Sequence, residues 1–165
     1  MQIKSGYVYL RFTIKNRKMS KLINDITINA PIEKIWSILT DLELLGQTDP
    51  TVKKATLISE NKTGLNAKRK VLMLDGKNWF DEKITVFKPN EELVYQLTDC
   101  SFPIKGLKHT YSFQKNGNST KVQQVMEYTV KYGILGVLMD KMMIGKQFNS
   151  GINKFLTGLK TYAEK

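Results

Sequence analysis

The clearest pattern in this sequence is an alternation of apolar and polar side chains between residues 107 and 129, interrupted once by the turn-forming letters NGN. Such an alternation predicts two antiparallel strands with one covered face and one face in water. The face expected to be covered carries Leu107, His109, Tyr111, Phe113, Val122, Gln124, Met126 and Tyr128. The opposite face carries Lys108, Thr110, Ser112, Gln114, Lys121, Gln123, Glu127 and Thr129. The pairing parity is the same whether the turn centres on Asn116-Gly117 or on Gly117-Asn118.

A second hairpin is predicted in the stretch AKRKVLMLDGKNWFDEKITVF, residues 67–87, with its turn at Asp75-Gly76. Counting faces across this turn places Arg69 and Glu82 on one side, among Val71, Met73, Phe80, Ile84 and Val86. Burying charged groups is costly unless they are paired and hydrogen-bonded. Two interpretations stay open: a structural ion pair near a strand end, or polar groups of a binding cavity in which Arg69 orients a ligand oxygen or carboxylate.

Two segments have helical periodicity instead. Residues 31–46, PIEKIWSILTDLELLG, place apolar side chains at three-and-four spacing and reach Gly46 as a stop. The segment from about residue 133 to residue 165 carries a regular apolar stripe of Phe148, Ile152, Phe155, Leu159 and Tyr162, with Leu156 and Ala163 beside it. In its first turns Met139 and Met143 point away from the stripe while Lys141 falls on it, which predicts a bend near Gly145.

The order of elements is one strand in KLINDITINAP at 21–31, a helix, about six antiparallel strands and a long helix. An antiparallel sheet with one wet face needs an apolar cover on the other face, and only the C-terminal segment is long enough to supply it. The predicted fold class is therefore α+β, with a curved antiparallel sheet wrapped around a long C-terminal helix. A cavity is expected between the two wherever large side chains do not fill the space.

Composition narrows the class of protein. A chain of 165 residues is long enough for one domain with a sizeable core and short for two. With 41% hydrophobic and 25% charged residues, and no apolar run near the roughly 18 residues of a membrane-spanning helix, we expect a soluble protein. The first residues lack the apolar core of a secretion signal, so the cytoplasm is the expected location. One Cys and one His do not make an ordinary zinc site, so no metal is expected, and no motif indicates a cofactor.

The net charge of +11 is compatible with an anionic membrane, nucleic acid or an acidic ligand. Residues 1–18 hold five of the positive charges and no acid, which leaves +6 for the rest of the chain. No dense basic cluster with interleaved aromatic residues occurs in that remainder, so nucleic acid is not expected as a partner. A solvated, lysine-rich surface is favoured, with at most weak contact to a membrane surface or a protein.

The order of elements, together with ITINAPIEKIWSILTDLELLG at 26–46, resembles the START and polyketide cyclase-like superfamily, often called SRPBCC, which has the helix-grip fold. Further similarities are Gly64 with Arg69, KPNEELVY at 88–95, GNSTKV at 117–122 and the terminal helix. The resemblance covers about residues 19–165. One departure is Gln47-Thr48 before Asp49-Pro50, where family members often carry a Trp.

This resemblance implies a single domain over residues 19–165 that binds a hydrophobic or amphipathic small molecule, such as a lipid, a polyketide-like or an aromatic compound. The residues expected to line its binding site are Arg69, Val71, Phe80, Glu82, Ile84, Tyr95, Leu97, His109, Tyr111, Phe113, Gln124, Met126, Tyr128, Phe148 and Ile152. In this interpretation Arg69 supplies the charge that fixes a polar group on an otherwise apolar ligand, and loss of Arg69 weakens an anionic ligand more than a neutral one.

Two other functions stay open. The resemblance also allows a polyketide cyclase, aromatase or dehydratase, in which Arg69, Glu82, His109 and Tyr111 would position the substrate and move protons. His109 has the ordinary pKa nearest neutrality, although a single histidine on an apolar face is more often a satisfied core residue. The third candidate is a protein-interaction module of the same fold, with Met139, Met142 and Met143 as its contact. A pairing of His109 with Cys100 is discounted because Cys100 has the opposite face parity from Tyr95.

The lead of residues 1–18 is interpreted either as the product of an upstream start codon or as an added edge strand in YVYLRFTIK at 7–15. A basic, acid-free tail has little to bury. We therefore expect its removal to leave the melting temperature within a few degrees, which corresponds to about 1 kcal/mol for a domain of this size. A large loss of stability would show that the segment belongs to the sheet.

Overall fold

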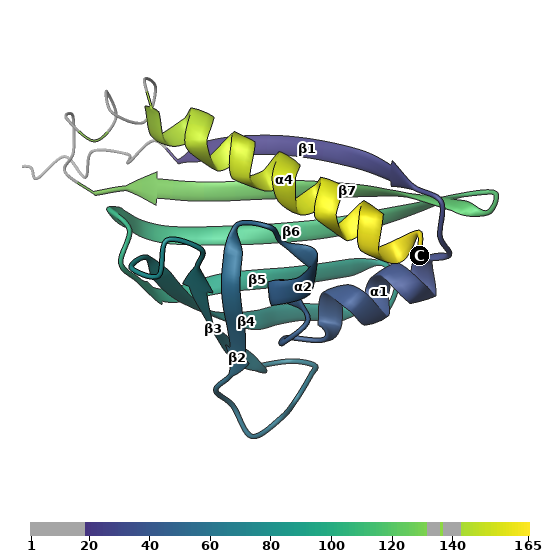
Figure 1. Cartoon of the computed structure of the whole chain (residues 1–165), viewed down its shortest axis with the longest axis horizontal. Helices are drawn as coiled ribbons and strands as arrows, with labels where there is room; N and C mark the ends of the chain where they lie inside the picture. The colour runs from purple at the N-terminus through teal and green to yellow at the C-terminus, as the bar shows by residue number, and fades with distance from the viewer. Residues whose placement is uncertain (1–18, 132–135, 137–142) are drawn as a thin grey trace, which may run out of the picture.

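The computed structural model describes residues 19–131, 136 and 143–165. Within them the strands form one seven-stranded antiparallel sheet in the order β1-β7-β6-β5-β4-β3-β2 (Figure 1). The strands are β1 Ser20–Ile28, β2 Val52–Leu57, β3 Lys68–Met73, β4 Trp79–Lys88, β5 Glu92–Cys100, β6 Ile104–Asn116 and β7 Ser119–Val130. Consecutive strands from β2 to β7 are neighbours, and β1 pairs with β7, so the first two strands of the chain, β1 and β2, form the two opposite edges of the sheet.

The helices are α1 Ile32–Thr40, α2 Leu45–Thr48 and α4 Gly145–Ala163, and in Figure 1 they lie against one face of the sheet. The apolar stripe predicted for the last helix is confirmed, because Ile152, Phe155 and Leu159 are buried in the core while Phe148 and Tyr162 are partly buried against it. The predicted helix-grip fold is therefore what the structure shows.

Both hairpins have the register that the alternation predicted. Arg69 lies directly opposite Glu82, and Tyr111 lies directly opposite Gln124. Asn116 pairs with Ser119, so the two turn residues between them are Gly117 and Asn118. Gly117 has a φ of 60°, a left-handed conformation that glycine adopts without a steric penalty, which explains why the tight turn forms at this point.

The prediction of one helix reaching Gly46 is wrong, because α1 ends at Thr40 and the separate short helix α2 begins at Leu45. Carbonyl groups at the end of a helix lack intrahelical partners. Here side chains from the sheet side supply donors to three carbonyls of this turn: Tyr95 Oη to Leu39 O (2.7 Å), Thr63 Oγ1 to Thr40 O (3.1 Å) and Arg69 Nη1 to Leu42 O (3.5 Å). Donors from distant parts of the chain thus favour the break in the helix over its continuation.

Helix α4 packs directly on the end of α2. A Cβ atom placed on Gly158 would collide with the carbonyl oxygen of Thr48, so only glycine allows the two backbones to approach this closely. This contact holds the loop after α2, with Asp49 and Pro50, beside the middle of the long helix. The segment that precedes β2 is in this way brought next to residues more than one hundred positions later in the sequence.

Several predictions concern residues outside the described part of the chain. These are the lead of residues 1–18, the methionines Met139 and Met142, and Lys141, so the predicted bend near Gly145 stays a prediction. Met143 is described and half exposed, with 50% of its surface accessible. Among the described residues, no helix combines the length and apolar character needed to cross a membrane.

Candidate functional site

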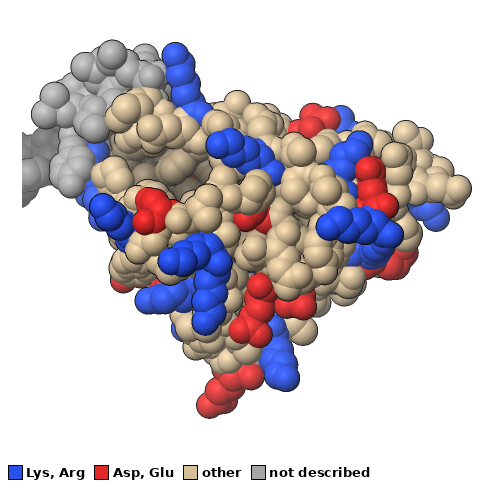
Figure 2. Space-filling view, in the orientation of Figure 1, with Lys and Arg blue, Asp and Glu red and all other residues tan. Residues whose placement is uncertain are grey.

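A cavity of about 430 Å³ lies between the concave face of the sheet and α4. Figure 2 shows that the molecule is hollowed on the side of the sheet that carries the helices, beside the first turns of α4. Most of the wall is apolar, and it is built from Leu45, Met73, Phe80, Leu97, Phe102, Ile104, Leu107, Met126, Phe148, Ile152 and Phe155. A cavity of this size, with apolar walls and a few polar groups, has the usual character of a small-molecule site.

The ion pair of Arg69 and Glu82 lies in the wall of this cavity. Both residues are buried, at 5% and 2% exposure, and Arg69 places Nε at 2.8 Å and Nη2 at 2.6 Å from the same carboxylate oxygen, Oε1 of Glu82. The guanidinium carbon lies 4.4 Å from the centre of the Tyr95 ring, a cation–π distance. Burial opposes the charge of Arg69, but the neighbouring Glu82 carboxylate outweighs burial, and the pKa of Arg69 is raised above its usual value.

A second polar group in the wall consists of His109, Tyr111 and Gln124. Gln124 is buried, and its Nε2 lies 2.8 Å from His109 Nδ1 and 3.2 Å from Tyr111 Oη. When Nε2 donates to the imidazole, Nδ1 is the acceptor and the ring proton lies on the other nitrogen of His109. Burial lowers the pKa of His109 and, together with the Glu82 carboxylate, raises the pKa of Tyr111 well above its ordinary value. Both side chains are therefore neutral near pH 7.

The mouth of the cavity is bordered by Asp49, Thr51 and Lys154. The Asp49 carboxylate accepts hydrogen bonds through Oδ1 from the backbone N–H (2.8 Å) and the hydroxyl (2.7 Å) of Thr51. Burial raises the pKa of Asp49, although these hydrogen bonds and the charge of Arg69 act in the opposite direction. Lys154 of α4 is exposed and borders the same cavity.

Ten of the fifteen residues predicted to bind the ligand line this cavity. They are Arg69, Phe80, Glu82, Leu97, His109, Tyr111, Gln124, Met126, Phe148 and Ile152. The other five, Val71, Ile84, Tyr95, Phe113 and Tyr128, also point to the covered face, but they do not border the cavity. Phe113 packs against Trp36 of α1, Tyr95 reaches the end of α1 through its hydroxyl, and Tyr128 packs against Phe148.

Sequence reasoning missed the residues that come from loops and from the side of α4. Asp49 and Thr51 follow the short helix α2, and Gly151 and Lys154 lie one turn apart on α4. Only the family resemblance connected Asp49-Pro50 with a pocket entrance. The packing of α2 against Gly158 leaves no periodic pattern in the sequence from which it could be predicted. Gly151 could have been found, because a glycine inside an apolar helical stripe often marks a place where space is left open.

Cys100 lies at the end of β5 and does not border the cavity. Its Sγ contacts the carbonyl oxygen of Phe102 at 3.6 Å, and burial raises the pKa of this thiol. A raised pKa and a position outside the cavity both argue against a pairing of Cys100 with His109.

In the described part of the chain, no group of three or more His, Cys, Asp or Glu side chains is arranged to hold a metal ion.

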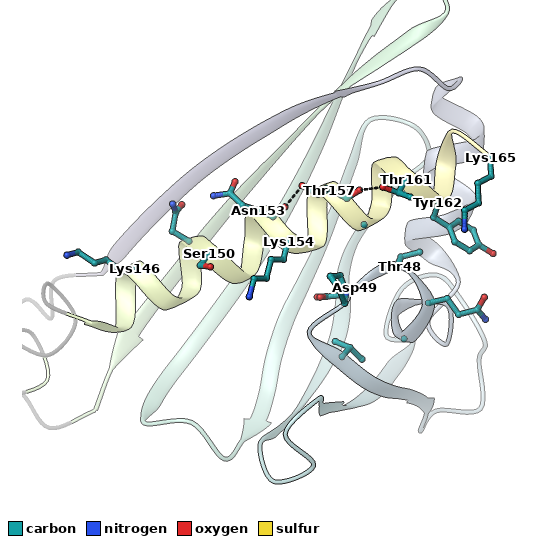
Figure 3. A pocket seen from close by; sticks show the side chains of 16 residues that line it. Thr48, Asp49, Lys146, Ser150, Asn153, Lys154, Thr157, Thr161, Tyr162 and Lys165 are labelled. Atoms are coloured by element: carbon teal, nitrogen blue, oxygen red, sulfur yellow. Dashed lines mark hydrogen bonds between the residues drawn. The ribbon is translucent and has the colours of Figure 1, made fainter.

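A larger but open groove of about 860 Å³ runs along the outer face of α4 beside α2 (Figure 3). Its helix side carries Lys146, Lys154, Tyr162 and Lys165 together with short polar side chains. Two of the short side chains bond to the helix itself: Thr157 Oγ1 donates to Asn153 O at 2.8 Å, and Thr161 Oγ1 donates to Thr157 O at 2.9 Å. Groups satisfied in this way offer little to a ligand. The smaller interior cavity, with its buried polar groups and apolar wall, is therefore the better candidate site.

Comparisons with known proteins agree with this geometry. A family model described as polyketide cyclase / dehydrase and lipid transport matches residues 19–164. The Zhui aromatase/cyclase from Streptomyces sp. R1128 has a similar structure, with a TM-score of 0.77 at 12% identity over 89% of this chain and 94% of that chain. TTHA0849 from Thermus thermophilus gives a TM-score of 0.74 at 19% identity, over 87% and 97% of the two chains.

The protein XoxI from Bacillus cereus is also similar, with a TM-score of 0.70 at 16% identity over 87% of this chain and 95% of that chain. At such identities the likeness of the structures shows a shared fold. No curated protein sequence matches the chain.

Proposed function

Because the chain belongs to the polyketide cyclase / dehydrase and lipid transport family, we propose that its interior cavity binds one hydrophobic or amphipathic small molecule, such as a lipid, a polyketide-like or an aromatic compound. The observation that carries this proposal is the cavity itself. About 430 Å³ of space with a largely apolar wall is retained beside the buried polar side chains of Arg69, Glu82 and Gln124. An empty apolar space of this size costs stability, so its presence in the folded chain is best explained by a ligand that fills it.

Gly151 provides a direct test, because it borders the cavity and a Cβ atom placed on it meets no atom within 4 Å. In Gly151→Phe the new ring would occupy the ligand's space. The neutral fluorophore N-phenyl-1-naphthylamine is a suitable probe, since it brightens in apolar surroundings. We expect wild type to bind it and Gly151→Phe to lose at least roughly tenfold in affinity, which corresponds to about 1.4 kcal/mol.

Gly151→Ala is the matched control, because it removes the free-energy cost of a glycine inside a helix without filling the cavity. It should bind the fluorophore like wild type and raise the unfolding free energy by about 0.5–1 kcal/mol. Equal binding by all three proteins would place the fluorophore outside the cavity and contradict the proposal. If Gly151→Phe alone loses the fluorophore, native mass spectrometry of protein purified from its own host should identify the natural ligand as an adduct of defined mass that Gly151→Phe lacks.

A second candidate function is an enzyme of the cyclase or dehydratase type, and the position of His109 favours it. A neutral imidazole that Gln124 orients through Nδ1 keeps a proton on its other ring nitrogen, and this N–H can donate to the carbonyl oxygen of a bound compound while the nearby Glu82 carboxylate takes an α-proton. The probe is 2-tetralone in deuterated buffer, with exchange of its α-protons followed by NMR. An enzyme would accelerate exchange over buffer by roughly 10²–10⁴-fold. His109→Gln should abolish this effect while Tyr162→Phe, which lies outside this cavity, retains it. Exchange at the buffer rate with wild type would rule out this chemistry.

A further inference from the structure

We propose that the ligand of the cavity presents a hydroxyl hydrogen to the Glu82 carboxylate, so that the site selects neutral hydroxylated molecules over carboxylates. This inference rests on the proposed binding function and names the chemical class of the ligand. It assigns ligand recognition to the acid of the buried ion pair, where the sequence suggested the arginine.

The first support is the unequal use of the two Glu82 oxygens. Both hydrogen-bonding contacts from Arg69 reach Oε1. Among the described residues no hydrogen bond reaches Oε2, and Glu82 lines the cavity. A carboxylate oxygen accepts hydrogen bonds and cannot donate them while ionised, and an O–H donor to such an oxygen forms a strong, charge-assisted bond.

The second support is the state of Arg69. Two of its nitrogens face Glu82, a third points to the carbonyl oxygen of Leu42, and the face of the guanidinium lies over the ring of Tyr95. The Glu82 carboxylate neutralises its charge, and Asp49 adds a second carboxylate at the cavity mouth. Lys154 borders the cavity as well and offsets the charge of Asp49. A carboxylate ligand inside the cavity would therefore meet the Glu82 carboxylate and an arginine that is already paired, which disfavours its binding.

The third support comes from the group of His109, Tyr111 and Gln124. Gln124 directs Nε2 at both His109 Nδ1 and Tyr111 Oη, and its own Oε1 has no partner among the described residues. Tyr111 accepts in this arrangement, so its hydroxyl hydrogen is left to donate, as is the second ring nitrogen of His109. A hydroxyl both donates and accepts, and it can therefore give its hydrogen to Glu82 and receive one from Tyr111 or His109. A carboxylate only accepts.

The experiment uses three naphthalenes of one shape and measures their affinity for the full chain by calorimetry at neutral pH. The probes are 2-naphthol, 2-methylnaphthalene and 2-naphthoate, which carry a hydroxyl, a methyl and a carboxylate at the same position. We expect wild type to bind 2-naphthol roughly tenfold or more tightly than either of the others, the ratio that one hydrogen bond to a charged group supports.

The test variant is the double substitution Arg69→Met/Glu82→Leu, because replacing a buried ion pair by apolar side chains is often neutral or stabilising. It should bind 2-methylnaphthalene at least as well as wild type does and lose the preference for 2-naphthol. Gln124→Leu keeps the ion pair, is expected to fold in any case, and should reduce the preference by a few fold. Tyr162→Phe, which lies on α4 outside this cavity, should keep the preference.

Each outcome separates this inference from the binding function itself. Similar affinities of wild type for all three probes, or tightest binding of 2-naphthoate, would overturn the hydroxyl preference while cavity binding stands. A preference for 2-naphthol that persists in both Arg69→Met/Glu82→Leu and Gln124→Leu would also overturn it. Failure of every probe, together with failure of N-phenyl-1-naphthylamine, would refute the binding function and with it this inference.

Discussion

At one end of the space between the sheet and the helices, Trp36 of α1 places its ring against the edges of Phe87 and Phe113, with centroids 5.0 and 5.7 Å apart. At the other end, inward side chains from the same sheet, among them Phe80 and Leu97, border a cavity of about 430 Å³. We call these the closed end and the open end. Their strands have the same inward and outward alternation, so the difference comes from the helices: α1 covers the closed end, whereas α4 bridges the open end without filling it.

The Arg69–Glu82 pair stands between the two ends. Arg69 reaches the Leu42 carbonyl and the Tyr95 ring toward the closed end, while both members of the pair border the cavity. One ion pair therefore holds the loop after α1 and also forms a polar wall of the site. The two interpretations of this pair, a structural ion pair or part of a binding cavity, describe its two sides.

The largest expected effect on stability comes from breaking the Arg69–Glu82 ion pair between the two ends. Glu82→Leu would leave Arg69 buried and unpaired, and we expect the unfolding free energy to fall by about 3–5 kcal/mol in urea denaturation. In Arg69→Met/Glu82→Leu no charge is left unpaired, so most of this loss should be recovered. An equal loss in the single and double variants would show that the pair contributes through its contacts to α1 and that its charge balance matters little.

Truncating one phenylalanine at each end compares their packing directly. Phe113 and Phe80 are both half-buried, one against Trp36 and the other on the cavity wall. Phe113→Ala would open a new hole, and we expect a loss of about 2–3 kcal/mol, below the ~3–5 kcal/mol of fully buried sites. Phe80→Ala only enlarges an existing cavity, so its cost should stay near about 1 kcal/mol. Equal costs by urea denaturation would mean that the open end is packed as tightly as the closed one.

A smaller effect is expected where the closed end is joined to α1 by a hydrogen bond. Tyr95 is 1% exposed and donates to the carbonyl oxygen of Leu39 at 2.7 Å. Tyr95→Phe would leave this carbonyl without its donor, which should lower the unfolding free energy by about 1–2 kcal/mol. Tyr162→Phe is the control, since Tyr162 is only partly buried on α4, and its cost should stay within about 0.5 kcal/mol. If both variants lose equally, the end of α1 does not depend on Tyr95.

The smallest expected effect is a pH dependence that belongs to the open end. Burial lowers the pKa of His109 below its ordinary value of 6.5, so the unfolded chain binds a proton more readily than the folded one. The contribution of His109 to stability is then fully present above about pH 6.5 and is lost as the pH falls toward the lowered value.

Asp49, whose pKa is raised by burial, acts in the opposite sense in a more acidic range, because its ionised form is the disfavoured one. The measurement is the unfolding free energy between about pH 7.5 and 5 for wild type and for His109→Gln, which lacks the titrating imidazole. Parallel pH curves for the two proteins would contradict the lowered pKa of His109.

Much of the fold could be predicted because it depends on local geometry. Alternation with a period of two gave the hairpin pairs Arg69–Glu82 and Tyr111–Gln124, and the helical stripe gave the buried side of α4. The wall of the site was predicted in the same way, since every residue predicted for it faces the covered side. Alternation could not show which inward residues border the cavity. Five of the predicted residues face inward but pack against helices or aromatic rings.

The sequence by itself therefore determined which side chains face inward and which pair across a turn, because backbone periods and short turns link residues close together in the chain. The tertiary structure alone decided where α1 stops, since the carbonyls of its last two residues are satisfied by Tyr95 and Thr63 from distant segments. It also decided which inward residues border the cavity and which loop forms its mouth. A cavity is the volume that remains after separate elements have packed, and that volume depends on contacts between residues far apart in the sequence.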